Sequence, residues 1–253
     1  MPVIAALISM RCFYLPEPKL CNGAIIHLPS ELKKHLQTVL RLQPGDKIQL
    51  FNGAGQVATS ILRENSEVEL QNVIKHPLPL CSLILIQGIP KGDKLELILQ
   101  KGTELGINEF HLTTMERSIG LLKSNRQEKR LERWKKIVQE AARQSRQYYL
   151  PQLVVDTKLT GALSTVEADL KLLLWEESTT PLTEVLPQLP PQRVAVVVGP
   201  EGGITQQEVA QATEKGYQPV SIGPRILRTE TAGLAIMTIL QYLYGDLASG
   251  QHG

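Results

Sequence analysis

The sequence predicts an α/β protein in which a small, mostly β domain precedes a larger domain of alternating strands and helices. Short strand-like runs separated by turn residues fill residues 11–75, whereas strand-like and helix-like segments alternate from residue 80 onward. The two patterns meet at His76-Pro77-Leu78-Pro79, where each proline fixes its own backbone angle and favours an extended predecessor. We therefore expect a first domain over residues 1–76 and a second over residues 77–253.

Length and composition fit this organisation. The chain has 253 residues, of which 42% are hydrophobic, and this is enough for a sizeable core. The net charge of +2 is too small to indicate nucleic-acid binding from the total, so any basic surface must be local. No apolar window approaches the roughly eighteen residues of a membrane span. Residues 3–8 are too short for a signal peptide, which leaves Met10 as a candidate initiator.

Cysteine and histidine spacing predicts neither a disulfide framework nor a metal site. The cysteines, Cys12, Cys21 and Cys81, are odd in number, widely spaced and without a Cys-x-x-Cys pair. The histidines are equally dispersed and support neither a triad nor metal ligation. They are His27, His35, His76, His111 and His252. We infer a reducing, cytoplasmic setting, no bound metal and no membrane association.

The first domain is expected to hold one short helix and several strands. Ser30 is the candidate N-cap of the helix, which Pro44-Gly45-Asp46 would end. Its apolar residues at helical spacing are Leu32, Leu36, Val39 and Leu40. Strands are expected over residues 47–51, 57–62 and 68–74, with Asn52-Gly53 as a hairpin signal.

The second domain is expected to be a largely parallel sheet covered by helices. Its predicted strands cover residues 83–88, 108–114, 153–156, 170–175, 194–198 and 219–222. Its predicted helices cover residues 93–105, 127–147, 205–215 and 229–244. Thr205 and Glu208 have the spacing of a capping box, and Asp93 and Glu96 repeat it in what could be a plain turn.

Two glycine-rich segments follow predicted strands near the end of the chain. The first is Gly199-Pro200-Glu201-Gly202-Gly203, whose glycines would let the backbone approach a ligand at the carboxyl ends of strands. It matches neither a Walker loop nor Gly-x-Gly-x-x-Gly, and it could be a plain turn. The second is Ile222-Gly223-Pro224-Arg225-Ile226-Leu227-Arg228-Thr229-Glu230, whose arginines suit phosphate. Alternatively, these arginines only pair with Glu201 or Glu230.

Basic residues are concentrated between residues 117 and 146. The apolar stripe of the predicted helix contains Leu131, Trp134, Ile137 and Ala141, so the basic residues lie largely on the opposite face. An RNA backbone would fit that face. A solvated face with intrahelical pairs such as Glu132 with Lys136 is an equal alternative.

Together these motifs resemble the 16S ribosomal RNA (uracil-N3)-methyltransferases of the SPOUT superfamily. The resemblance covers nearly the whole chain from Arg11. Beyond the two glycine-rich segments, it includes Arg11-Cys12-Phe13, Val39-Leu40-Arg41, Gly45-Asp46, Lys101-Gly102-Thr103-Glu104-Leu105-Gly106, Glu116-Arg117-Ser118, Glu140-Ala141-Ala142 and Gln144-Ser145. After Gln144-Ser145 the family generally has Gly-Arg, whereas this chain has Arg146-Gln147. Arg146 therefore either makes the family's contact or only compensates for it.

The resemblance implies a PUA-like RNA-binding β-barrel followed by an α/β domain with a deep trefoil knot. It also implies S-adenosylmethionine as cofactor, a homodimer formed through the knotted domains, and methylation of one uridine of small-subunit (16S) rRNA, free or in the 30S subunit. The implied cofactor residues are Leu174, Trp175, Glu176, Gly199, Pro200, Glu201, Gly202, Gly203, Ile222, Gly223, Ile226 and Leu227. The candidate RNA-binding residues are Arg11, Arg41, Arg117, Arg143 and Arg146.

For the chemistry, we expect positioning to supply much of the rate. Arg225 and Arg228 would stabilise a uridine anion or hold its phosphate, while Glu201 and Glu230 would orient the base or accept its proton. Two alternatives stay open, a ribose 2′-O-methyltransferase of the same superfamily and a non-catalytic ribosome-assembly protein. A nucleotide hydrolase is the weakest reading, because a phosphate loop and a recognisable magnesium-binding pair are absent from the sequence.

Overall fold

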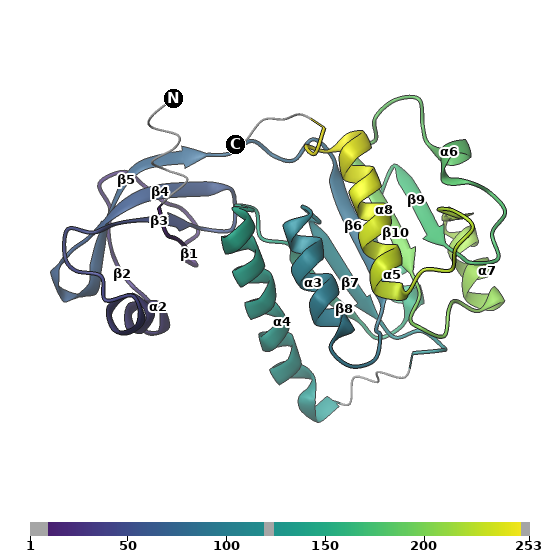
Figure 1. Ribbon diagram of the computed structural model, residues 1–253, viewed down its shortest axis with the longest axis horizontal. Helices are drawn as coiled ribbons and strands as arrows, with labels where there is room; N and C mark the ends of the chain where they lie inside the picture. The colour runs from purple at the N-terminus through teal and green to yellow at the C-terminus, as the bar shows by residue number, and fades with distance from the viewer. Residues whose placement is uncertain (1–9, 119–123, 249–253) are drawn as a thin grey trace. The chain divides into compact units, whose positions relative to one another are not determined.

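The computed structural model describes residues 10–118 and 124–248, with the side chains of residues 124–127 left out (Figure 1). The chain forms two compact units. The first contains the chain up to Leu78 together with Ala142–Leu150, and the second contains Pro79–Ala141 and the chain from Pro151 onward. The predictions that concern residues 3–8, His252 and the part of the basic segment that contains Lys123 lie outside the described residues. Within the described ranges, no helix combines the length and apolar character that crossing a bilayer requires.

A curled five-stranded sheet forms the first unit (Figure 1). Its strands are β1 (Cys12–Tyr14), β2 (Ile25–His27), β3 (Lys47–Phe51), β4 (Gln56–Leu62) and β5 (Glu67–Lys75). They lie in the order β1-β3-β4-β5-β2, with β1 parallel to β3 and the remaining pairs antiparallel. Ile48, Leu50 and Leu70 are fully buried in its core. The three strands expected here are confirmed, whereas the three-residue strands β1 and β2 were too short for the pattern to predict.

The helix of the first unit differs from its predicted form. The helix α2 (Ser30–Lys34) continues into the π-helical turn η1 (His35–Val39). Ser30 is not the cap, because it already lies inside the helix; Pro29 is the cap, and its carbonyl oxygen accepts the Lys33 N–H at 2.9 Å. A π turn holds more residues than an α turn. The predicted apolar face of the helix is therefore not kept through this turn: Leu36 is buried, but Val39 is 65% exposed.

A six-stranded, fully parallel sheet forms the second unit. Its strands are β6 (Ser82–Gly88), β7 (Glu109–Thr113), β8 (Gln152–Asp156), β9 (Leu170–Leu174), β10 (Arg193–Val198) and β11 (Gln218–Val220). Their order is β11-β9-β10-β6-β7-β8. The parallel sheet and all six strands predicted for this part are confirmed.

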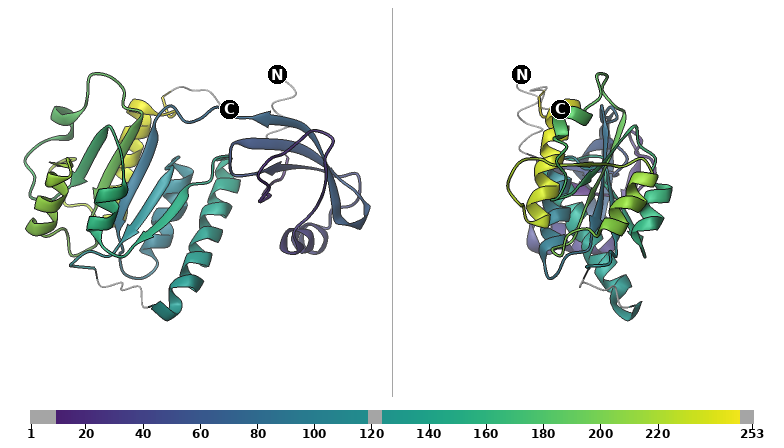
Figure 2. Two further views of the ribbon diagram at one scale, coloured as in Figure 1. Left: turned by 180° about the vertical axis from the view of Figure 1, so that it is seen from behind. Right: turned by 90° about the vertical axis from the view of Figure 1, so that its right-hand side faces the viewer.

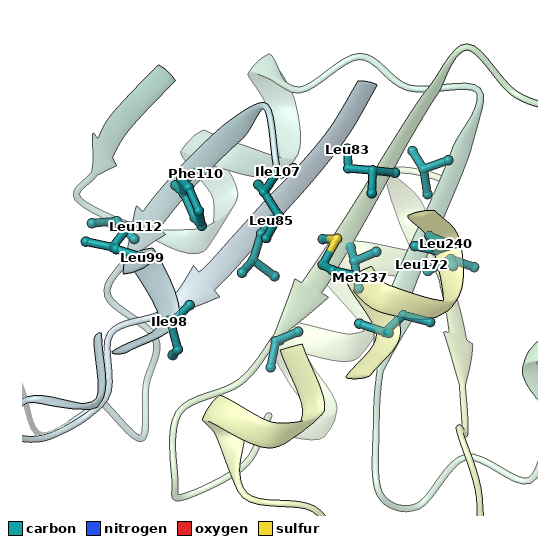
Figure 3. Close-up of a cluster of buried hydrophobic side chains, with 14 of the residues drawn as sticks. Leu83, Leu85, Ile98, Leu99, Ile107, Phe110, Leu112, Leu172, Met237 and Leu240 are labelled. Carbon is teal, nitrogen blue, oxygen red and sulfur yellow. The ribbon is translucent and has the colours of Figure 1, made fainter. Parts of the chain in front are cut away.

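Helices cover both faces of this sheet (Figure 2). They are α3 (Lys94–Glu104), α4 (Ser124–Ser145), α5 (Leu159–Thr165), α6 (Leu182–Val185), α7 (Gln206–Glu214) and α8 (Thr229–Tyr244). Leu83 and Leu85 of β6 face a core shared with α3 and α8 (Figure 3), whereas Ile84 and Ile86 face α5 and α7. This alternation follows from the two-residue period of a strand, and it explains why β6 is apolar throughout. The short helices α5 and α6 were not predicted.

The two expected capping boxes have different outcomes. That of Thr205 and Glu208 is confirmed, since each side chain accepts the other residue's backbone N–H, at 3.3 Å and 3.0 Å. The box of Asp93 and Glu96 is wrong. Asp93 makes no side-chain capping bond, and the Glu96 carboxylate instead pairs with Arg133 at 2.6 Å. The Glu96 carboxylate, which would have accepted the Asp93 N–H in a capping box, is thus paired with Arg133 of α4 instead.

The register of the sheet brings the carboxyl ends of its central strands together. Val198 at the end of β10 pairs with Gln87 of β6 and with Leu174 at the end of β9, and Leu174 pairs in turn with Val220 of β11. Segments that are distant in sequence therefore leave the sheet side by side. This edge is where ligands bind in open parallel sheets.

Candidate functional site

A cavity of about 490 Å³ lies at the carboxyl ends of β9, β10 and β11. Its volume is in the range of small-molecule sites. All the residues that the family resemblance assigned to the cofactor line this cavity. They are Leu174, Trp175, Glu176, Gly199, Pro200, Glu201, Gly202, Gly203, Ile222, Gly223, Ile226 and Leu227. The wall also contains residues outside that set, among them Lys94, Val198, Ile204 and Ser221, which sequence reasoning gave no ligand role, and Thr229 of the second glycine-rich segment.

Glycine shapes the loop between β10 and α7. Gly203 has a φ of 76° and donates its N–H to the carbonyl oxygen of Pro200 at 3.0 Å, which closes a tight turn. A side chain at Gly199 would begin 2.6 Å from Cγ1 of Ile204, and one at Gly203 would meet the Glu176 carboxylate. Glycine is therefore required at both positions of this tight loop, which borders the cavity together with the side chains of Pro200 and Glu201.

Gln87, near the carboxyl end of β6, connects the two glycine-rich segments by hydrogen bonds. Its side chain is fully buried, and its Nε2 donates to the carbonyl oxygen of Gly88 and to Oγ1 of Thr229, both at 2.9 Å. Thr229 in turn donates its hydroxyl to the carbonyl oxygen of Gly199 at 2.5 Å. The Oε1 atom of Gln87 is buried and has no hydrogen-bond partner among the described residues. A polar residue at the end of the apolar run of β6 was the signal that could have marked Gln87 in the sequence.

The candidate carboxylates share one cation, and that cation is a lysine. Lys94 Nζ lies 3.0 Å from Oε1 of Glu201 and 3.5 Å from Oε2 of Glu230. The idea that Arg225 or Arg228 pairs with these carboxylates is not supported, since within residues 10–118 and 124–248 neither arginine forms an ion pair with them. Glu230 does not itself line the cavity and meets it through Lys94.

Electrostatics keep Glu201 ionised. Partial burial raises the pKa of its carboxyl group, but hydrogen bonds from Lys94 and backbone N–H groups, with the charge of Lys94, outweigh burial and lower the pKa overall. The Lys91 N–H is one of these donors, at 3.2 Å from both oxygens. The pKa of Lys94 is raised chiefly by its hydrogen bond to Glu201.

Arg225 and Arg228 line the same cavity and are both exposed. Arg228 is the N-cap residue of α8, with extended backbone angles. In the described part of the chain, no hydrogen bond or ion pair occupies either guanidinium. Both groups are therefore available to bind an anion at the mouth of the cavity.

Three of the five arginines predicted to bind RNA make contacts within the protein. Arg117 donates to the carbonyl oxygen of Gly202 at 2.9 Å, which places it against the cofactor loop. Arg143 donates to the carbonyl oxygen of Cys12 at 3.5 Å, and its guanidinium lies 5.9 Å from the centre of the Phe13 ring. Arg11 and Arg41 are exposed.

Arg146 occupies an unusual backbone position. Its φ is 59°, in the left-handed region that glycine adopts without strain, and this is where the resembling family generally has glycine. Its guanidinium donates to Oε1 of Gln49 at 3.3 Å and to the carbonyl oxygen of Met10 at 3.4 Å. These contacts within the first unit stabilise a conformation that is unfavourable for arginine.

The helix α4 buries its predicted apolar stripe in part. Trp134 and Ala141 are buried, and Leu131 and Ile137 are half-buried. Glu132 pairs with Lys135 at 2.8 Å, on the side of the helix that carries the basic residues. The alternative of a solvated, charge-paired face thus describes at least this part of the helix.

Comparison with known proteins identifies relatives over most of the chain. Residues 76–241 match a family model described as an RNA methyltransferase domain, and residues 28–70 match an RNA methyltransferase PUA domain. Ribosomal RNA small subunit methyltransferase E of Bacillus subtilis is 34% identical, covering 82% of this chain and 86% of the relative. The protein of the same name from Synechocystis is 36% identical, covering 85% and 72% respectively.

Solved structures agree with these relatives. A ribosomal RNA small subunit methyltransferase E from Neisseria gonorrhoeae, bound to S-adenosylmethionine, superposes with a TM-score of 0.83 at 36% identity, covering 94% of this chain and 99% of the other. A Legionella pneumophila methyltransferase in complex with the same cofactor superposes with a TM-score of 0.86 at 29% identity and equal coverage.

Proposed function

This chain belongs to the ribosomal RNA small subunit methyltransferase E family, and from that premise we propose that it methylates N3 of one uridine in 16S rRNA. The methyl donor is S-adenosylmethionine, as in the two crystallised relatives. The observation that carries the proposal is the single cavity whose wall contains both glycine-rich segments together with Arg225 and Arg228.

The cavity fits this donor chemically. Leu174, Val198 and Leu227 supply an apolar lining for an adenine ring and the aliphatic part of a methionine chain, while the backbone of the loop from Gly199 to Gly203 borders the cavity with polar groups. In our proposal the cofactor is held by all the lining residues predicted from the sequence. When bound, S-adenosylmethionine supplies a methyl group activated by the positive charge of its sulfonium.

The side chains of this protein must then prepare the uridine. Methylation replaces the N3–H bond with an N3–C bond, so one proton leaves and negative charge develops on the base. Arg228 and Arg225 line the cavity and would stabilise that charge or hold the neighbouring phosphate. Glu201 would orient the base or accept the proton, directly or through water, whereas Glu230, which does not line the cavity, would do so through water. Positioning of N3 against the methyl group would supply much of the rate.

RNA binding is proposed for the first domain, residues 1–76, with methyl transfer in residues 77–253. The match of residues 28–70 to a PUA domain of RNA methyltransferases supports this division. Arg11 and Arg41 are exposed on the first unit and would contact RNA phosphates. Arg117, Arg143 and Arg146 would act mainly by holding the surfaces around them. The substrate would be 16S rRNA, free or in the 30S subunit, in the cytoplasm.

We further propose that the protein is a homodimer formed through the second domain. The helix α8 packs on α3 and β6, yet Ile239, Tyr242 and Leu243 on it are exposed. An apolar helix that is only partly covered by its own chain is typical of an interface between identical subunits. The trefoil knot is proposed from the resemblance to the SPOUT superfamily. The chain path is compatible with it, since the chain returns from the edge strand β11 to the centre of the sheet, where α8 packs on β6.

Nucleoside mass spectrometry of 16S rRNA from cells lacking the gene tests the function. We expect loss of one N3-methyluridine and its return with the wild-type gene. Loss of a ribose 2′-O-methyl group instead would identify the alternative enzyme. Unchanged rRNA, with no binding of S-adenosylmethionine by calorimetry, would favour a non-catalytic assembly protein.

A further inference from the structure

Lys94 lines the cavity, carries a positive charge and has no role in the proposed function. It is the first residue of α3 and follows the turn Lys91-Gly92-Asp93, which leaves the carboxyl end of β6. Its side chain is one-third exposed and lines the cavity. The sequence pattern gave this turn no role beyond starting a helix.

The ammonium group of Lys94 joins two elements that are far apart in the chain. Glu201 comes from the loop after β10, and Glu230 comes from the first turn of α8. Glu230 is 14% exposed, and its Oε2 has no hydrogen-bond partner among the described residues, although Lys94 lies 3.5 Å away. Without the lysine, two carboxylates would face each other with no cation between them, which is unfavourable.

Building on the proposed function, we propose that Lys94 is a positioning residue for methyl transfer. Its ammonium group holds the Glu201 carboxylate at the cavity wall and uses Glu230 as its second anchor. Lys94 acts through Glu201 and does not itself exchange the uridine proton. The Lys91 N–H, at 3.2 Å from both Glu201 oxygens, fixes the same carboxylate from the opposite end of the turn.

The charges near Glu201 indicate that Lys94 keeps this carboxylate ionised and that Glu201 contacts the substrate. The charged groups nearest Glu201 are Lys94 from α3 and Glu230 from α8. Glu176, Arg225 and Arg228 line the same cavity, and Arg117 donates to the carbonyl oxygen of the neighbouring Gly202. Because the pKa of Glu201 is lowered, its carboxylate is a weak base that stays ionised at neutral pH. Such a group is suited to accepting a hydrogen bond from the substrate and orienting it.

The pH dependence of turnover follows from this arrangement. In Lys94→Met the hydrogen bond and the charge that lower the pKa of Glu201 are lost, while burial, which raises it, remains. Glu201 is needed ionised, so activity falls as the pH drops through the pKa of Glu201. The acid limb of the rate profile should therefore move to higher pH in Lys94→Met.

The experiment compares methylation of 30S subunits by full-length variants across the acid and neutral range. We expect kcat of Lys94→Met to fall roughly 10- to 100-fold with a displaced acid limb. Lys94→Arg keeps a cation at this position and should recover most of the rate. Lys101→Met is the matched control, since it removes the exposed pair with Glu104 at 2.9 Å on the same helix. A wild-type acid limb in Lys94→Met would overturn the proposal.

A double-mutant cycle separates an effect that passes through Glu201 from a general loss caused by Lys94→Met, and Lys94→Arg provides the folded variant if Lys94→Met is unstable. In a Glu201→Gln background, Lys94→Met should have little further effect, because the carboxylate that it positions is gone. Fully additive losses would contradict the proposal. The same cycle read in the free energy of unfolding needs no turnover. Failure of the proposed function would be seen separately, as a wild-type product other than N3-methyluridine.

Discussion

The hydroxyl of Thr229 donates a hydrogen bond of 2.5 Å to the carbonyl oxygen of Gly199, thirty residues earlier in the chain. The side-chain amide of Gln87, on β6, donates to the same hydroxyl at 2.9 Å. The start of α8 and the loop after β10 are thereby fixed to each other and to β6. Because these hydrogen bonds link the two walls of the cavity, a substitution that breaks them at one wall should lower the affinity for the cofactor.

Thr229→Val should weaken binding of S-adenosylmethionine. Valine keeps the shape but removes the donor to Gly199 and one of the acceptors of the Gln87 amide, so two buried hydrogen bonds are lost at about 0.5–1.5 kcal/mol each. If part of this loss appears in binding, the calorimetric Kd should rise roughly tenfold, since about 1.4 kcal/mol corresponds to one decade. Thr238→Val is the control, because the exposed Thr238 hydroxyl donates to the carbonyl oxygen of Leu234 within α8 at 2.8 Å, away from the cavity. Equal affinities for both variants would show that the Thr229–Gly199 hydrogen bond does not support cofactor binding.

Gly203→Ala should lower cofactor affinity more than it lowers stability. Both Gly203 and Gly216 have positive φ, so an alanine at either position costs about 1–2 kcal/mol of backbone strain. At Gly203 the new methyl group would also displace the Glu176 carboxylate, whereas open space surrounds Gly216. We expect similar losses in the free energy of unfolding, measured by urea titration, but weakened binding only in Gly203→Ala. Weakened binding in both would mean that strain alone matters.

Arg228→Ala should abolish methylation and leave the fold and the dimer intact. Its guanidinium lines the cavity and is exposed, so its removal disturbs little packing. Loss of a group that stabilises developing charge lowers kcat by roughly 10²- to 10³-fold. Turnover on 30S subunits and circular dichroism provide the two readouts, with Lys158→Ala as a control at an exposed lysine away from the cavity. Retained turnover would remove Arg228 from the chemistry.

Only one of the three cysteines should react rapidly with a thiol reagent in the native protein. Burial raises the pKa of Cys12 and of Cys81 to about 11, and both side chains are shielded, whereas Cys21 is exposed. A thiolate is present only near or above its pKa, so at pH 8 roughly one in a thousand of these two buried thiols is ionised. Mass spectrometry after alkylation should show one label per chain, and none in Cys21→Ser. Rapid labelling at Cys12 or Cys81 would contradict the buried environments.

Tyr242→Glu should dissociate the proposed dimer. Tyr242 is 63% exposed on α8 beside Ile239 and Leu243, and a charge there would be buried on association. Light scattering should show the mass of a single chain for this variant and twice that mass for the wild type. Leu189→Glu, at a residue 80% exposed outside α8, is the matched control and should stay dimeric. A dimeric Tyr242→Glu would place the interface elsewhere.

Local patterns in the sequence were sufficient for most elements of the second unit. The bounds of α8 agree with the predicted residues 229–244, and the capping box of Thr205 and Glu208 was predicted from spacing alone. Both depend on residues within one or two turns of each other. The helix of the first unit was harder, because its π-helical turn changes the spacing that the prediction assumed.

By itself, the sequence determined the two kinds of architecture, the glycine-rich segments and the resemblance that connects them, since periodicity and turn chemistry act over short stretches of chain. Only the tertiary structure decided which groups meet at the cavity. The backbone of Lys91 binds Glu201 across 110 positions, and Gln87 binds Thr229 across 142. Such contacts depend on how parallel strands are ordered and registered in the sheet, and that order is set by packing of the whole domain, which no local window of sequence contains.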